Sequence, residues 1–208
     1  MASWIRRSFS APGLTQIPPG AGLAALQGRY GGTVMLCIDV SGSMDGLPIL
    51  EAVRGATEFV TEAVEAHYQV GVMLWNTEVV ALAEPSADGV AAQQLLAGVR
   101  GAYGGNFLIG PLSHCHQILD RATGDRVVAL FGDGDLTPRA EVLAKVAQMK
   151  AENIRFVTRG LGPPAAREFA EIGSDEEAAR VEVRSVDELA AGIASMAASL
   201  RSRGGSRA

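Results

Sequence analysis

The chain has 208 residues, of which 48% are hydrophobic and 20% are charged, and this composition predicts one compact domain with a sizeable core. A net charge of -5 argues against a surface that binds nucleic acid or an anionic membrane, because both need clustered basic residues. No apolar run approaches the ~20 residues of a membrane span, and Pro and Gly interrupt the N-terminal segment before it reaches signal-peptide length. We therefore expect a cytoplasmic protein.

Apolar strands alternate with helical patterns in the first half of the chain. Residues 33–39 predict a buried strand, and residues 48–66 predict a helix that begins at Pro48 and carries one apolar stripe. Residues 68–75 and 77–83 predict two further strands. Because so few residues separate these two strands, they should form a hairpin, which places an antiparallel strand at the edge of an otherwise parallel sheet.

The second half of the chain continues this alternation. Its predicted strands cover residues 127–131, 154–158 and 181–183. Four helices are predicted here. The first covers residues 89–99, and the second begins near Leu108. The third begins at Pro138 with Thr137 as its cap, and the fourth follows the capping-box sequence that starts at Ser185. This order of elements predicts an α/β sandwich with a mostly parallel sheet.

We expect residues 32–200 to form a single domain. Residues 1–31 contain Pro and Gly among scattered apolar side chains, which predicts an extended segment that packs on the domain or on a partner. Residues 201–208 are basic and contain Gly and Ser, which predicts a disordered tail.

The loop after the first predicted strand offers three oxygen-bearing side chains at alternate positions, Asp39, Ser41 and Ser43. Residues two apart in an extended turn can point the same way, and Gly42 permits a backbone conformation that a side chain would resist. Magnesium prefers oxygen ligands and usually binds one or two carboxylates. The loop therefore predicts an incomplete magnesium site, with an ordinary strand-to-helix turn as the alternative.

Two more polar loops should lie at the same edge of the sheet. Gly104, Gly105 and Asn106 precede a predicted helix, and Asp133 follows the strand at residues 127–131 between two glycines. Ligands of open α/β sheets bind beyond the carboxyl ends of the strands. The three loops are therefore expected to meet at one site.

These three loops, in this order and on these elements, resemble the von Willebrand factor A (VWA) family with its metal-ion-dependent adhesion site (MIDAS). The resemblance covers residues 32–200 and implies a Rossmann-like three-layer sandwich that binds Mg2+, with Mn2+ or Ca2+ as alternatives. The ligands that it implies in the first and third loops are Asp39, Ser41, Ser43 and Asp133. The family usually has Thr after the two glycines of the second loop, where this chain has Asn106. Asn106 can either ligate the ion or cap the helix that follows.

The resemblance also implies how such a site is used. A partner protein would supply a Glu or Asp to an ion whose own ligand shell is incomplete. Intracellular members of the family commonly work with AAA+ ATPases of the MoxR or chelatase kind, or in conflict and signalling systems. We therefore expect an adaptor or regulator that binds another protein, and neither nucleic acid nor a membrane.

Two other interpretations stay open at this point. Asp39 could be the nucleophile of a magnesium-dependent phosphohydrolase, although Ser41 stands where such enzymes place a second Asp. The domain could also be a metal-free VWA scaffold. Because the sequence contains neither a Ser/His/Asp set nor a phosphate-binding G-x-x-x-x-G-K motif, we expect a protein that is not an enzyme.

Overall fold

The fold is built around a five-stranded sheet, in a computed structural model that describes residues 31–134, 136–174 and 182–200. The strands are β1 (Gly32–Asp39), β2 (Tyr68–Trp75), β3 (Val79–Ser86), β4 (Asp125–Gly132) and β5 (Ile154–Gly160), in the spatial order β3-β2-β1-β4-β5. β1 pairs in parallel with β2 and β4, β4 pairs in parallel with β5, and β3 runs antiparallel at one edge. The sheet is therefore mostly parallel with one antiparallel edge strand, as predicted.

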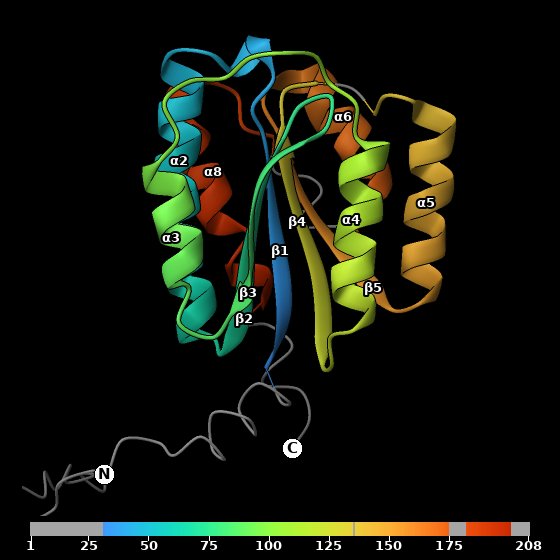
Figure 1. Cartoon of the computed structure of the whole chain (residues 1–208). Coiled ribbons are helices and arrows are strands. Elements are labelled where there is room, and N and C mark those ends of the chain that lie inside the picture. Colours follow the sequence, from blue (N-terminus) through green and yellow to red (C-terminus); the bar gives the residue numbers. More distant parts are fainter. Residues whose placement is uncertain (1–30, 135, 175–181, 201–208) are drawn as a thin grey trace, which may run out of the picture.

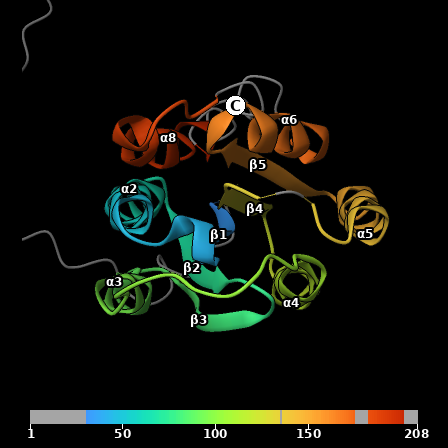
Figure 2. The ribbon, with the colours of Figure 1, turned by 90° about the horizontal axis from the view of Figure 1, so that it is seen from above.

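Helices cover both faces of the sheet and complete three layers (Figure 1 and Figure 2). One face carries α2 (Leu47–Glu65), α3 (Val90–Ala97) and α8 (Leu189–Ser195). The other face carries α4 (Ile109–Asp120), α5 (Arg139–Ala151) and α6 (Gly162–Ile172). Two single-turn 3-10 helices, η1 (Gly42–Met44) and η2 (Val186–Glu188), precede α2 and α8. This is the expected Rossmann-like three-layer sandwich.

The central strand β1 is buried on both faces, which explains why its sequence is almost continuously apolar. Val34 and Leu36 pack into the core on the α2 side of the sheet. Met35 and Cys37 pack into the core on the α4 side, because successive side chains of a strand point to opposite faces. Helices thus cover both faces of β1, and the strand leads into the first loop at its carboxyl end, at Asp39.

The helix predicted to follow Thr137 begins one residue later than expected. Pro138 occupies its cap position, and α5 starts at Arg139. The backbone carbonyl of Thr137 instead accepts a hydrogen bond of 2.8 Å from the N–H of Leu108, which ties this segment to the loop before α4. The prediction of Thr137 as the cap was therefore wrong.

Residues 181–183 do not add the expected strand to the sheet. Val183 forms an isolated parallel bridge with Leu161, and residue 181 lies outside the described residues. The side chain of Val183 packs instead against Gly192 of α8, where an added Cβ would lie 2.3 Å from it. The predicted extension and tail also lie outside the described residues, apart from Gly31. Among the described helices, none has the length and hydropathy that crossing a membrane requires.

The sequence analysis did not anticipate α6. Pro163 and Pro164 occupy its first turn, where a missing N–H removes no helical hydrogen bond. Ala165, Phe169 and Ile172 follow at helical spacing and are buried. The Gly-Pro-Pro sequence is typical of a loop, so this short apolar stripe was the signal that could have revealed the helix.

Candidate metal centre

Three loops meet at the carboxyl ends of the strands, at the top of the molecule in Figure 1. Backbone hydrogen bonds join the first loop to the second: Gly42 N donates to Gly104 O at 3.0 Å, and Tyr103 N donates to Val40 O at 2.8 Å. Gly104 has a φ of +87°, and a Cβ there would lie 2.9 Å from Nδ2 of Asn76. Glycine is therefore required at position 104 by both conformation and space.

Trp75, the last residue of β2, ties this strand to the first loop. Its backbone carbonyl accepts a hydrogen bond of 2.7 Å from Val40 N, and the register of the two strands pairs it with Asp39. The indole ring is fully buried. The start of the loop that follows β1 is therefore held by the backbone of a residue whose side chain is packed in the core.

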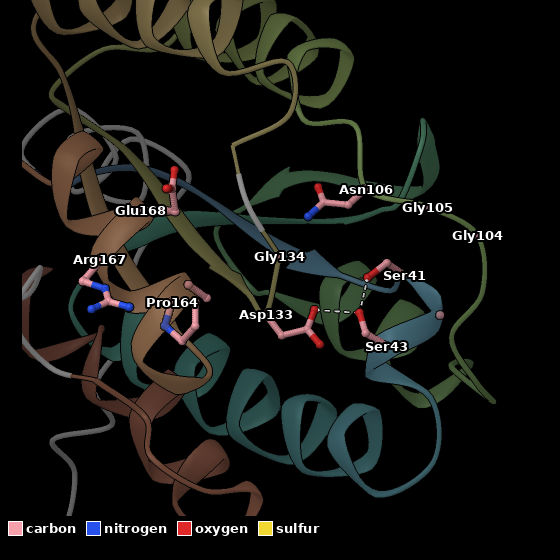
Figure 3. Close-up of a pocket in the computed structure, with 12 residues that line it drawn as sticks. Ser41, Ser43, Gly104, Gly105, Asn106, Asp133, Gly134, Pro164, Arg167 and Glu168 are labelled. Carbon is pink, nitrogen blue, oxygen red and sulfur yellow. Dashed lines mark hydrogen bonds between the residues drawn. The ribbon is translucent and has the colours of Figure 1, made fainter.

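Hydroxyl groups connect the first loop to the third (Figure 3). The Oγ atoms of Ser41 and Ser43 are 3.1 Å apart, and Ser43 Oγ donates to Oδ1 of Asp133 at 2.9 Å. The sequence separates Ser43 from Asp133 by 90 positions. The fold thus brings into contact the polar side chains that the sequence placed on different loops.

The loops and α6 surround a pocket of about 510 Å³ (Figure 3). The loop side is formed by two serines, one amide, one carboxylate and several glycines. These residues are Ser41, Gly42, Ser43, Gly104, Gly105, Asn106, Asp133 and Gly134. The α6 side is formed by Pro164, Ala165, Arg167 and Glu168. The loop side of the pocket wall therefore carries hydroxyl, amide and carboxylate groups, and its α6 side carries one charge of each sign.

Asp39 does not line this pocket, because its side chain is fully buried. Its Oδ1 accepts a hydrogen bond of 2.8 Å from Ser41 N, whereas its buried Oδ2 has no hydrogen-bond partner among the described residues. Burial is the main cause that raises the pKa of Asp39 from 3.8 to about 6. Gly132 provides the space, since a Cβ there would lie 3.0 Å from Oδ2. A buried carboxylate of this kind is costly unless a cation reaches it.

Asn106 lines the pocket but does not cap α4. The cap position of α4 is Leu108, two residues further on, so the cap interpretation was wrong. The physical reason is that Phe107 N donates to Asn76 O at 2.9 Å, which holds the chain on the end of β2 before the helix begins. The amide of Asn106 lies against Gly134, where an added Cβ would be 1.6 Å from Nδ2.

The side chains at this site fit a hard divalent cation. Every donor is an oxygen-bearing group, and such donors suit magnesium, manganese and calcium. In the part of the chain that the structure describes, no three His, Cys, Asp or Glu side chains form a cluster, so a metal site here would depend on hydroxyl and amide oxygens as well as carboxylates. The residues predicted as ligands were Asp39, Ser41, Ser43, Asn106 and Asp133. The structure brings four of them to the pocket wall and places Asp39 fully buried at the base of the same loop. Their role as ligands stays a prediction.

Two side chains that the sequence analysis did not single out hold the second loop in place. Nδ2 of the buried Asn76 donates to the carbonyl of Tyr103 at 2.8 Å. Oδ1 of Asp45 accepts a hydrogen bond of 3.1 Å from Ala102 N. Asn76 lies in the short connection between the predicted strands at residues 68–75 and 77–83, and no sequence pattern pointed to Asp45. Both act by shaping the backbone around the site.

Comparison with known proteins gives the same fold. Residues 34–135 match the family model described as von Willebrand factor type A domain.

The vWF domain of the type V pili tip protein Mfa5 from Porphyromonas gingivalis aligns with 81% of this chain and 94% of its own, at 12% identity and a TM-score of 0.71. The pilus adhesin SpaC from Lactobacillus rhamnosus GG aligns with 82% of this chain at 13% identity and a TM-score of 0.71, and this chain spans 30% of that adhesin. Proximal thread matrix protein 1 from the mussel byssus, with a zinc-occupied MIDAS motif, aligns with 78% of this chain and 46% of its own, at 18% identity and a TM-score of 0.63.

No curated protein matches the chain in sequence. Identities of 12% to 18% to the three solved structures establish a shared fold and not a shared activity. The family match covers β1 to β4 and therefore all three loops of the candidate metal centre. The match and the shared fold together identify this chain as a member of the von Willebrand factor type A domain family.

Proposed function

We propose that this domain binds another protein through a divalent metal ion, to which the partner contributes a Glu or Asp side chain. The observation that carries the proposal is the meeting of three oxygen-bearing loops at one pocket, together with the buried Oδ2 of Asp39 at the base of the first loop, which has no hydrogen-bond partner among the described residues. A bound ion would supply a fixed positive charge that attracts one further anionic oxygen.

The chain's own residues would divide the work of holding the ion. Asp39 and Asp133 would match its two positive charges, while Ser41, Ser43 and Asn106 would add neutral oxygens. Magnesium takes about six oxygen ligands, so water or a partner group must complete the shell. We propose Mg2+ as the ion, with Mn2+ or Ca2+ as alternatives, because the donors are oxygen atoms only.

Exposed apolar side chains next to the loops in sequence support a protein as the ligand. They are Leu47, Leu50, Tyr103 and Phe107, which are 56%, 58%, 63% and 42% exposed. Leu47 and Leu50 lie at the start of α2, just after the first loop, and Tyr103 and Phe107 flank the glycines and Asn106 of the second loop. Exposed large apolar side chains are a common component of protein interfaces. A small anion would not need them.

Burial of Asp39 disfavours the phosphohydrolase interpretation. A nucleophilic carboxylate must reach the phosphorus of its substrate, but Asp39 has no exposed surface and does not line the pocket. The same burial disfavours a metal-free scaffold, because Oδ2 of Asp39 then has no partner among the described residues. An interaction module with a metal ion accounts for both observations.

The identity of the partner is proposed on the family resemblance alone. We propose an intracellular role with a MoxR-type AAA+ ATPase or with a component of a conflict or signalling system, as an adaptor or regulator in the cytoplasm. SpaC and Mfa5 are pilus proteins, so a partner at a cell surface is the competing outcome.

Metal binding tests the proposal first. Isothermal titration with MgCl2 and MnCl2 should show binding by the wild-type chain and a loss of roughly tenfold or more in Ser43→Ala. Ser113→Ala is the matched control, because the Ser113 hydroxyl donates to the carbonyl of Ile109 within α4, outside the pocket. Absence of binding at millimolar magnesium and manganese would overturn the metal site.

Partner capture tests the second half of the proposal. An immobilised wild-type chain should retain a candidate ATPase or system component in magnesium and release it in EDTA, whereas Ser43→Ala should not retain it. Ser113→Ala should behave as wild type. Retention that is the same with and without EDTA would contradict a metal-bridged contact.

A further inference from the structure

We propose that Arg167 selects partners that carry a second carboxylate close to the one that would bind the metal. This inference rests on the proposed function and specifies the chemistry of the partner. The partner is a protein segment with two acidic side chains, one for the ion and one for the guanidinium of Arg167.

Arg167 lies on the α6 side of the pocket, across from Asn106 (Figure 3). Its side chain is exposed, and no group in the described part of the chain forms a hydrogen bond or an ion pair with it. Several other arginines in the domain form ion pairs. Arg155, for example, lies 2.6 Å from a carboxylate oxygen of Asp125.

The neighbouring acid does not neutralise Arg167. Glu168 also lines the pocket, but it forms an ion pair with Arg139 of α5, which contacts Glu171 at 2.6 Å as well. Adjacent residues of a helix project about 100° apart, and Figure 3 shows Arg167 and Glu168 pointing in different directions. The two side chains therefore serve different contacts.

The charges around the pocket leave Arg167 as the group without a counter-charge. Asp39 and Asp133 together match the charge of a divalent ion, and Arg139 engages Glu168. Within the described pocket wall, the guanidinium of Arg167 then carries one positive charge that no carboxylate of the domain matches. An ion with an open ligand position and an unmatched guanidinium would each suit one carboxylate, so a ligand with two carboxylates could use both.

A guanidinium suits this second role because its planar donors match the two oxygens of a carboxylate. A single exposed ion pair contributes little by itself, so Arg167 would discriminate among partners that the metal already anchors. We expect the second carboxylate to improve binding by roughly two- to fivefold.

Selection from a phage-displayed library of random peptides tests the inference. Phage would be bound to the immobilised full chain in magnesium and eluted with EDTA. The wild type should enrich peptides with two acidic residues, whereas Arg167→Gln should enrich peptides with one. Arg121→Gln is the matched control, because Arg121 is exposed beyond the carboxyl end of α4 and does not line the pocket. It should give the wild-type result.

Synthetic versions of a selected peptide give the quantitative test. Replacing its second acidic residue by Gln should weaken magnesium-dependent binding to the wild type roughly two- to fivefold and should not change binding to Arg167→Gln. An equal loss with both proteins would overturn the role of Arg167.

The two failures are distinguishable in these experiments. If no peptide is released by EDTA from the wild type, the proposed function itself fails, and the inference fails with it. If EDTA releases peptides of equal acidic content from the wild type and from Arg167→Gln, the metal-bridged function stands and the inference alone is wrong.

Discussion

Two buried or mostly buried carboxylates lie at opposite ends of the same sheet and are treated in opposite ways. Asp125 begins β4, where Arg155 Nε contacts its Oδ1 at 2.9 Å and Tyr68 donates to its Oδ2 at 2.6 Å. Asp39 ends β1, where Oδ1 accepts a hydrogen bond from the backbone N–H of Ser41 and Oδ2 has no hydrogen-bond partner among the described residues. The domain thus supplies a cation to the carboxylate at one end of the sheet, whereas no described side chain supplies one to Asp39 at the other end.

The pKa values at the two ends reflect this difference. At the Asp39 end, burial raises the pKa of the carboxyl to about 6, and no cation opposes the effect. At the Asp125 end, the pKa of Tyr68 is raised to about 12, first by burial and then by its hydrogen bond to Asp125. The carboxylate of Asp125 is therefore paired with a cation within the domain, whereas the buried carboxylate of Asp39 has no such partner among the described residues.

The largest expected effect comes from breaking the ion pair at the Asp125 end. Arg155→Met leaves Asp125 without its cation, so we expect the free energy of unfolding to fall by about 3 kcal/mol in urea denaturation. Magnesium affinity should not change, because the substitution lies at the far end of the sheet. Arg121→Met, at an exposed arginine, is the control. A loss below about 1 kcal/mol would show that Asp125 does not depend on Arg155.

The next effect has the opposite sign. Asp39→Asn should abolish magnesium binding yet raise the free energy of unfolding of the metal-free protein by about 2 kcal/mol at neutral pH, because a buried charge is removed. Asp133→Asn should also weaken metal binding but should bring no such gain, since Asp133 is partly exposed. Urea denaturation in EDTA measures both. Destabilisation by Asp39→Asn would show that the buried charge of Asp39 does not destabilise the metal-free fold.

The dependence on pH should separate the two ends further. The pKa of Asp39 in the folded chain lies above its ordinary value of 3.8, so the folded state binds more protons between about pH 4 and pH 6. The metal-free protein should therefore lose stability as pH rises through this window, and Asp39→Asn should remove this component. Since the ion competes with the proton, magnesium affinity should fall roughly tenfold between pH 7 and pH 5. A flat titration of affinity over this range would exclude Asp39 as a ligand.

The smallest effect concerns the amide at the pocket. Gly134→Ala places a methyl group where the amide of Asn106 lies, and this should displace Asn106 and weaken magnesium binding roughly fivefold. Gly110→Ala is the control, because an added Cβ at Gly110 meets nothing within 4 Å. Calorimetry compares the two variants. Equal affinities would mean that Asn106 is not a ligand.

Local sequence patterns predicted the helices and strands around the site. They failed to predict helix boundaries that depend on hydrogen bonds to distant segments. The apolar run before Asp39 and the short connection after Trp75 were sufficient for β1 and the hairpin, because burial on both faces and turn length act locally. Asn106 was interpreted as a candidate cap, but hydrogen bonds from Phe107 and Leu108 to distant segments delay the start of α4. Local propensity could not reveal those acceptors.

The charged features were the least predictable part of the molecule. The contact of Arg155 with Asp125 and Tyr68 arises from strand register, which places residues of three different strands at one end of the sheet. The α6 side of the pocket was missed because Pro163 and Pro164 resemble a loop. The sequence therefore indicated the oxygen-bearing residues on the loop side of the pocket, and the structure was needed to find Arg167 on its α6 side.

Trp75 gives the candidate metal centre an optical reporter. The chain has two tryptophans, and the other one, Trp4, lies outside the described residues. In a Trp4→Phe variant all indole emission would come from Trp75, whose ring is fully buried and whose backbone carbonyl accepts a hydrogen bond from the N–H of Val40, next to Asp39. Magnesium is itself spectroscopically silent, but its arrival and its removal by a chelator could then be followed in real time, without labels, through the intrinsic fluorescence of one residue.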